Sequence, residues 1–284
     1  MVKQTDVELG DGRRLHAYDC GDIGTADDRI AVFWQHGTTN IGAPPQPLFS
    51  AAARLGFRWV SYDRPGYGGS TARPGRDVAS AADDVAAIAE ALGIDRFAIM
   101  GHSGGGPHAL ACGALLPDRV LGVVCVSGTA PYGADGLDWF AGMADAGVAS
   151  MSAAAEGRAA RQAYEESTDD LDFGFTPEDE AALGGAWSWL LDVVRLALAA
   201  GPEATIDDDL ASVAPWGFEP ARVAVPTMFL HGGRDRVVPS RHSEWLAGRI
   251  PSAQLRLYPN DGHITVLSHA RAAMEWLRDH ADRP

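Results

Sequence analysis

The segment IMGHSGGGPHALA, residues 99–111, constrains the fold of this chain more than any other. An apolar run leads into a Gly-x-Ser-x-Gly motif, and a helical pattern follows it. A serine on so tight a strand-to-helix turn has a strained backbone, and glycines flank it because a Cβ there would collide with neighbouring backbone. The motif therefore predicts that Ser103 stands at the carboxyl end of a strand, where the amino end of the next helix favours developing negative charge.

Short β-branched or aromatic runs alternate with Ala-rich amphipathic stretches along most of the chain. This alternation is typical of a mostly parallel sheet covered by helices, and so of an α/β protein. We expect buried strands within residues 30–37, 58–64, 96–103, 120–128, 225–235 and 253–259. We expect helices within residues 45–56, 77–93 and 240–249, and a last one that ends near His280. Gly56 and Gly93 are expected to end the first two helices.

The alternation stops between about Pro131 and Trp216. Glycines, prolines and acidic loops there separate three or more helical segments, and no convincing strand pattern occurs. We interpret residues 131–215 as a helical cap inserted into a core of residues 1–130 and 216–284. Within the cap, residues 165–180 carry eight carboxylates in sixteen positions, a density that favours a solvated linker.

Charge and cysteine content exclude several classes of protein. A formal net charge of −15 argues against a nucleic-acid partner, because such binding needs clustered Lys and Arg. Charged residues near the start, and no apolar run of about 18 residues, predict a cytoplasmic protein without a membrane span. Cys20, Cys112 and Cys125 show no metal-ligand or disulfide spacing, so we expect free thiols, no metal and no cofactor.

A serine hydroxyl needs a base before it can attack a substrate, and the chain offers nine histidines. His263 is the best candidate, because it follows the last predicted strand at the catalytic end of the sheet. A carboxylate must then orient the histidine, and Asp235 follows the penultimate strand. Asp261 is a poorer alternative, because it would have to fold back on its own loop. The order nucleophile, acid, histidine supports Ser103, Asp235 and His263 as a catalytic triad.

Acyl transfer also needs N–H donors for the oxyanion of the tetrahedral intermediate. The backbone amide of Gly104, directly after the nucleophile, is one expected donor. The second is expected from Thr38 in QHGTTN, the turn after an early strand. The sequence thus predicts an oxyanion hole between these two segments.

Five segments together resemble the α/β-hydrolase superfamily in its usual order. They are HG at 36–37, YDRPGYGGS at 62–70, GHSGGG at 101–106, HGGRDRVVP at 231–239 and DGH at 261–263. The chain is most similar to capped bacterial esterases and proline-iminopeptidase-like hydrolases. The resemblance implies a metal-free enzyme of α/β-hydrolase fold, with the roles above and a lid between the sixth and seventh strands. Dedicated iminopeptidases tend to have Trp directly after the nucleophile, where this chain has Gly104, so esterase activity is favoured over aminopeptidase activity.

The cap is rich in aromatic residues, which predicts a moderately apolar small substrate. We expect His102, Trp139, Phe140 and Trp187 to contact it. The expected reaction is hydrolysis of a small ester, lactone or thioester by a monomer or homodimer. An aminopeptidase or amidase, with Glu165 or Glu166 holding the substrate amine, remains open, as do a carbon–carbon bond hydrolase, a perhydrolase and a ligand receptor on the same scaffold.

Overall fold

Eight strands form one sheet across the part of the chain that the structure, a computed structural model, describes: residues 2–21, 29–167 and 172–281. Their order in the sheet is β1-β2-β4-β3-β5-β6-β7-β8. The strands β3 to β8 run parallel, whereas β1 and β2 add an antiparallel edge. The strands are β1 (Lys3–Glu8), β2 (Arg14–Asp19), β3 (Ile30–Gln35), β4 (Phe57–Tyr62), β5 (Phe97–His102), β6 (Val120–Val126), β7 (Thr227–Gly232) and β8 (Ala253–Tyr258).

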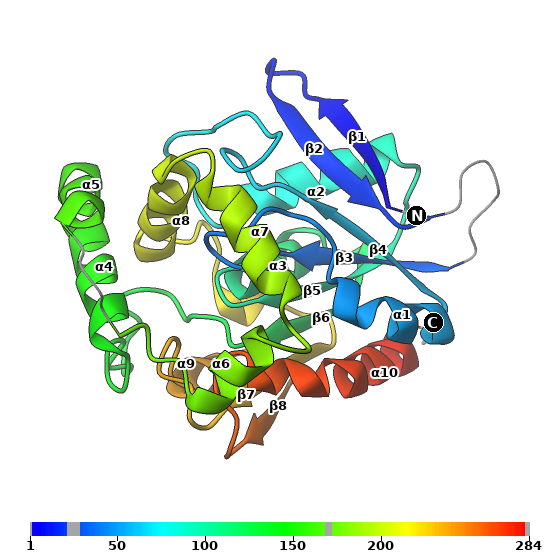
Figure 1. The fold of residues 1–284 in the computed structure, drawn as a ribbon. Helices are drawn as coiled ribbons and strands as arrows, with labels where there is room; N and C mark the ends of the chain where they lie inside the picture. Colours follow the sequence, from blue (N-terminus) through cyan, green and yellow to red (C-terminus); the bar gives the residue numbers. More distant parts are fainter. Residues whose placement is uncertain (1, 22–28, 168–171, 282–284) are drawn as a thin grey trace.

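Helices cover both faces of the sheet (Figure 1). The predicted α/β architecture is confirmed, and the predicted helix stops hold: Gly56 and Gly93 have left-handed φ angles of 67° and 64°. The helices of the sheet domain are α1 (Phe49–Leu55), α2 (Ser80–Ala91), α3 (Gly105–Leu115), α9 (Arg241–Ala247) and α10 (Ala270–Ala281), with the 3-10 turns η1 (Gln46–Leu48), η2 (Pro220–Arg222) and η3 (Thr265–His269).

Alternate residues of the central strands enter two separate cores. Phe33 of β3 and Ile99 of β5 pack under α2 and α3, whereas Trp34 and Met100 pack under α1 and α10. Successive side chains of a strand point to opposite faces, so a strand with a core on each side is apolar throughout. This burial on both sides fixes the strand register and, with it, the positions of the loops at the carboxyl ends.

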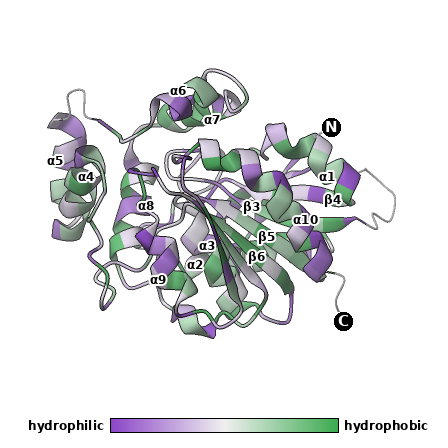
Figure 2. Cartoon of the chain, turned by 90° about the horizontal axis from the view of Figure 1, so that it is seen from below, coloured by the Kyte–Doolittle hydropathy of each residue, from purple (hydrophilic) through white to green (hydrophobic). Residues whose placement is uncertain are grey.

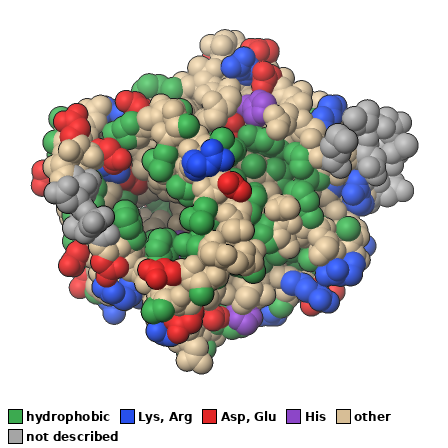
Figure 3. Space-filling view, viewed as in Figure 1, with side chains coloured by type: hydrophobic (Ala, Val, Ile, Leu, Met, Phe, Trp, Pro, Cys, Tyr) green, Lys and Arg blue, Asp and Glu red, His purple; other side chains and the backbone are tan. Residues whose placement is uncertain are grey.

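A run of helices separates β6 from β7 along the chain, in the region where the cap, residues 131–215, was expected; that this region is a separate domain stays a prediction. Its helices are α4 (Asp145–Glu156), α5 (Arg158–Ser167), α6 (Pro177–Leu183), α7 (Trp189–Leu198) and α8 (Glu203–Val213). The pair α4 and α5 lies at the periphery, with α8 between it and the sheet, and α6 and α7 lie at one end of the sheet (Figures 1 and 2). Hydrophobic side chains gather over α7 (Figure 3), where Leu191, Leu196 and Leu198 are exposed.

Candidate active site

Ser103 occupies a sharp turn between β5 and α3. Its φ angle is +54°, a conformation that is costly for a residue with a side chain. The turn is held because Ser103 N donates to the carbonyl of Val126 at 2.9 Å and Gly106 N donates to the Ser103 carbonyl at 2.8 Å. The half-buried serine is therefore presented at the carboxyl end of β5, as the motif predicts.

The flanking glycines are required by contact with neighbouring backbone. A Cβ on Gly101 would lie 2.6 Å from the carbonyl carbon of Gly105. A Cβ on Gly105 would overlap the carbonyl oxygen of Gln35 and lie 2.7 Å from that of His36. Approaches this short are not tolerated, so the steric reason for both glycines of the motif is confirmed.

His263 and Asp235 meet at the same end of the sheet. His263 lies in the loop after β8 and Asp235 in the loop after β7, and both side chains are buried. The Nδ1 atom of His263 lies 2.7 Å from Oδ2 of Asp235. The other oxygen, Oδ1, accepts the backbone N–H groups of Val237 at 3.0 Å and Val238 at 2.9 Å. An ionised carboxylate only accepts, so Nδ1 carries the proton and Nε2 is left as an acceptor.

The electrostatics of this pair keep Asp235 ionised. Burial alone would raise the pKa of Asp235, but the charge of His263 and hydrogen bonds from His231 and His263 outweigh it and hold the pKa well below its usual range. His231 Nε2 donates to the Val238 carbonyl at 2.7 Å and lies 3.4 Å from Asp235 Oδ2. Sequence reasoning missed His231, although its position four residues before Asp235 was visible.

Asp261, the alternative to Asp235 as the partner of His263, contacts a different histidine. Its Oδ2 lies 2.8 Å from Nε2 of His269, whose ring stacks on Tyr258 with centroids 3.5 Å apart. The backbone carbonyl of Asp261 accepts Arg234 N at 2.9 Å. Asp261 thus links the loop that carries His263 to His269 and Arg234, whereas Asp235 contacts the imidazole of His263 itself.

The turn after β3 lies directly against Ser103 and Gly104. A Cβ on Gly37 would lie 3.5 Å from Cβ of Ser103, and a Cβ on Gly104 would lie 3.0 Å from the backbone nitrogen of Thr38 and overlap its hydroxyl. The next residue, Thr39, is strained at φ +61° and donates its N–H to the Tyr67 hydroxyl at 3.1 Å. Both expected oxyanion segments are therefore in contact.

A buried ion cluster fixes that turn from behind. The Arg64 guanidinium donates to the carbonyls of His36 and Gly37 and to Asp208 of α8, whose Oδ2 lies 2.5 Å from Arg64 Nη2. Arg76 binds the other oxygen of Asp208 at 2.5 Å. Burial would raise the pKa of Asp208, but the charges of both arginines lower it well below its usual value. Sequence reasoning did not single out Arg64 or Asp208, which lie 144 positions apart.

A family model described as alpha/beta hydrolase fold matches residues 30–270. The chain belongs to the α/β-hydrolase family. A 2-hydroxy-6-oxononadienedioate/2-hydroxy-6-oxononatrienedioate hydrolase of Klebsiella pneumoniae is 27% identical and aligns over 93% of this chain and 89% of its own length. A pimeloyl-(acyl-carrier protein) methyl ester esterase of Neisseria meningitidis is 28% identical, over 80% of this chain and 84% of its own. The structure of a hydrolase from Pseudomonas aeruginosa matches with a TM-score of 0.74 at 20% identity, over 99% of both chains.

Of the side chains expected to contact substrate, His102, Trp139 and Trp187 are buried in this hydrolase, and Phe140 is half-buried. His102 Nε2 donates to the backbone carbonyl of His263 at 3.1 Å, and burial and the charge of His263 lower its pKa to about 3. Trp139 donates its Nε1–H to Ala130 and packs edge-on against Phe140, while Trp187 belongs to the core shared with α1 and α10. Their proposed role in substrate binding stays a prediction.

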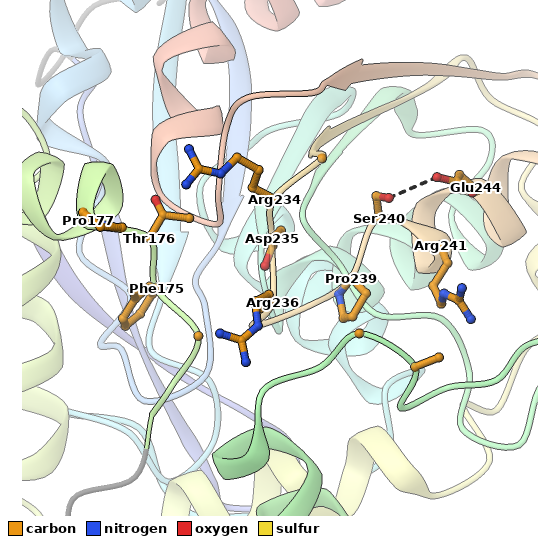
Figure 4. A pocket seen from close by; sticks show the side chains of 14 residues that line it. Phe175, Thr176, Pro177, Arg234, Asp235, Arg236, Pro239, Ser240, Arg241 and Glu244 are labelled. Atoms are coloured by element: carbon orange, nitrogen blue, oxygen red, sulfur yellow. Dashed lines mark hydrogen bonds between the residues drawn. The ribbon is translucent and has the colours of Figure 1, made fainter.

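An open cleft of about 740 Å³ lies next to Asp235, which is one of the residues that line it. Figure 4 shows Asp235 between Arg234 and Arg236, with the segment from Phe175 to Pro177 on one side and Arg241 and Glu244 on the other. Neither Ser103 nor His263 lines this cleft. None of the four expected substrate contacts lines it either: His102, Trp139, Phe140 and Trp187.

The expectation of a solvated linker over residues 165–180 is correct only in part, because residues 165–167 belong to α5, residues 177–180 belong to α6, and one carboxylate is buried. Asp172, Glu178 and Glu180 are exposed, but Asp179 is completely buried; residues 168–171 lie outside the described part of the chain. Asp179 starts α6 in a capping box with Thr176 and also accepts hydrogen bonds from the loop of His263. A carboxylate with this many donors can be buried at little cost.

Two features are absent from residues 2–21, 29–167 and 172–281. No group of three or more His, Cys, Asp and Glu side chains there could hold a metal ion. Within the same ranges, no helix is both long and apolar enough to cross a membrane.

Proposed function

We propose that this α/β-hydrolase is a serine esterase that cleaves a small, moderately apolar ester through an acyl-enzyme. Ser103 is the nucleophile, His263 the general base, and Asp235 the carboxylate that orients and stabilises the imidazolium. The observation that carries this proposal is the 2.7 Å contact between Asp235 and His263 Nδ1, at the sheet end that presents Ser103. It leaves Nε2 of the histidine free to accept the serine proton.

The reaction follows from these positions. His263 Nε2 accepts the proton of the Ser103 hydroxyl as the oxygen attacks the ester carbonyl. The backbone amides of Gly104 and Thr38 stabilise the oxyanion, and His263 then gives the proton to the departing alcohol. In the second half of the reaction, His263 accepts a proton from water, the water oxygen attacks the acyl-serine carbonyl, and the carboxylic acid leaves as Ser103 regains its proton. The same steps serve a lactone or a thioester.

We place the substrate between the sheet domain, residues 1–130 and 216–284, and the helical insertion acting as a cap. The esterase relative from Neisseria meningitidis supports an ester over an amide. The amidase alternative gains no support from Glu165, which binds Arg161 at 2.7 Å within the peripheral helix α5.

A substrate panel tests this proposal. p-Nitrophenyl esters of increasing chain length, amino-acid anilides and lactones are assayed with the wild-type protein and with Ser103→Ala as the blank. We expect turnover of short to medium esters that disappears in the variant. Turnover of anilides alone would support the amidase, and ester turnover that persists in Ser103→Ala would disprove the assigned nucleophile.

A further inference from the structure

Asp179 is a buried carboxylate of the helical insertion that the catalytic steps above do not use. It is the third residue of α6, and its side chain is 0% exposed. Asp179 N donates to the Thr176 hydroxyl at 3.1 Å, and Thr176 N donates to Asp179 Oδ2 at 3.1 Å. This reciprocal capping box starts the helix. The capping box accounts for only some of the hydrogen bonds that the Asp179 carboxylate accepts.

The same carboxylate also binds the loop that carries the proposed base. Oδ2 accepts the backbone N–H of His263 at 3.1 Å. Oδ1 accepts the N–H groups of Ile264 at 3.0 Å and Thr265 at 2.8 Å, and the Thr265 hydroxyl at 2.9 Å. Burial would raise the pKa of Asp179, but hydrogen bonds from Thr265, Thr176 and Ile264 outweigh it and lower the pKa. The group is therefore an ionised acceptor on three successive amides.

Gly262 is fitted to this carboxylate. A Cβ on Gly262 would overlap Asp179 Oδ2 and lie 2.7 Å from its Cγ, and the three nearest atoms all belong to Asp179. The backbone of Gly262 is outside the left-handed region, so its φ angle does not itself require glycine. Gly262 N donates to the Thr265 hydroxyl at 2.7 Å, and that hydroxyl donates in turn to Asp179. The middle residue of the DGH motif is thus small because a carboxylate from α6 lies against it.

We propose that Asp179 is a positioning residue that fixes the backbone of His263 and so couples the helical insertion to the catalytic base. The inference rests on the proposed function, because it takes His263 as the base. Helix α6 packs on η3, which directly follows this loop, so a displacement of α6 would move the imidazole relative to Ser103. A misplacement of about 1 Å can lower a rate by about 100-fold. A purely structural anchor for α6 is the competing explanation.

The first test is Asp179→Asn, with Glu178→Gln as the matched control. The amide keeps the shape but turns one acceptor into a donor that faces backbone N–H groups. Glu178 is the neighbouring carboxylate on α6; it is exposed and pairs with Arg234 at 3.3 Å. With sites counted by fluorophosphonate titration, we expect kcat on p-nitrophenyl acetate to fall about 10- to 100-fold in Asp179→Asn, with KM within about twofold. Glu178→Gln should keep both constants.

The second test is a double-mutant cycle between Gly262 and Asp179. Gly262→Ala alone should lower kcat, because its methyl group displaces the carboxylate. In the Asp179→Ser background the same change should have little further effect, because the colliding atoms are gone. Thr265→Val, which removes one donor to Asp179, is the milder variant should Asp179→Asn not fold; we expect its kcat to fall by about threefold or more.

The outcomes separate the two proposals. If Ser103→Ala removes activity while folded Asp179→Asn and Thr265→Val keep wild-type kcat, the positioning role is overturned and Asp179 is only an anchor. A Gly262→Ala effect of equal size in both backgrounds also overturns it. If Ser103→Ala keeps full activity, the proposed nucleophile fails, whatever the Asp179 variants do.

Discussion

Replacing Asp235 by Asn removes the negative charge that contacts His263 Nδ1 and changes the shape of the side chain very little. In the wild-type protein Oδ1 accepts the amides of Val237 and Val238, and Oδ2 lies 2.7 Å from His263 Nδ1. The carboxamide has one oxygen and one NH₂ group. Either the backbone amides or the imidazole can therefore keep an acceptor, but not both. The backbone amides cannot change their role, whereas the histidine can change its tautomer.

The structure therefore predicts which way the amide turns. If NH₂ faced Val237 and Val238, unpaired donors would be buried, at about 1–3 kcal/mol each. The oxygen should stay on the amides, so that NH₂ faces His263 Nδ1 and makes it the acceptor. Nε2 then carries the proton and cannot take one from Ser103. We expect kcat to fall by up to about 10⁴-fold, which corresponds to about 5.5 kcal/mol of transition-state stabilisation.

The assay is steady-state hydrolysis of p-nitrophenyl acetate, with thermal unfolding to confirm that Asp235→Asn is folded. The control is Asp261→Asn, because Asp261 binds His269 and not the imidazole of His263. It should keep kcat within a few-fold of wild type. Near-native turnover in Asp235→Asn together with a large loss in Asp261→Asn would refute the reasoning and reassign the acid to Asp261.

Ser103→Ala should lower kcat by about three or more decades, and intact-mass and peptide mapping should find the fluorophosphonate adduct on Ser103 alone; an adduct elsewhere contradicts the assignment. His102, whose pKa is lowered to about 3 by burial and the charge of His263, should stay neutral between about pH 5 and 9, so it should add no ionisation of its own to the pH dependence of kcat/KM. Asp208→Asn leaves Arg64 buried without its anion and should lower the free energy of unfolding by about 3–5 kcal/mol, measured by urea denaturation; a loss under about 1 kcal/mol would show that the cluster contributes little. Activity should survive dialysis against EDTA, and a requirement for added divalent metal would show that the site is misread.

Local sequence determined the parts of the site that depend on short-range sterics. The turn at Ser103 and its glycines follow from a strand joined directly to a helix, and the positive φ of Ser103 is what such a join requires. Gly56 and Gly93 end helices because they can adopt a left-handed conformation, a property of single residues. The parallel order of the central strands follows from their apolar runs and the helices between them.

The antiparallel edge was not predicted from the sequence. The strand β1 is as long as most strands of the sheet, but it is mostly exposed, and its one buried position is Val7. Polar alternation over six residues carries little periodic signal, so what makes these residues strands is their pairing with each other and with β4.

Only the tertiary structure decided which further carboxylates support the site. Asp179 stands between the exposed Glu178 and Glu180, and the local sequence gives it only a capping box with Thr176; its donors from the His263 loop lie more than 80 positions away. Asp207, Asp208 and Asp209 are all buried, and the fold pairs them with different arginines, Asp208 with Arg64 and Arg76. A side chain of one type can be solvated or fully buried according to which donors the fold brings to it, because burial of a charge depends on partners and not on composition. Strand order in the sequence thus places the proposed reacting groups, whereas long-range packing determines which residues hydrogen-bond to their loops.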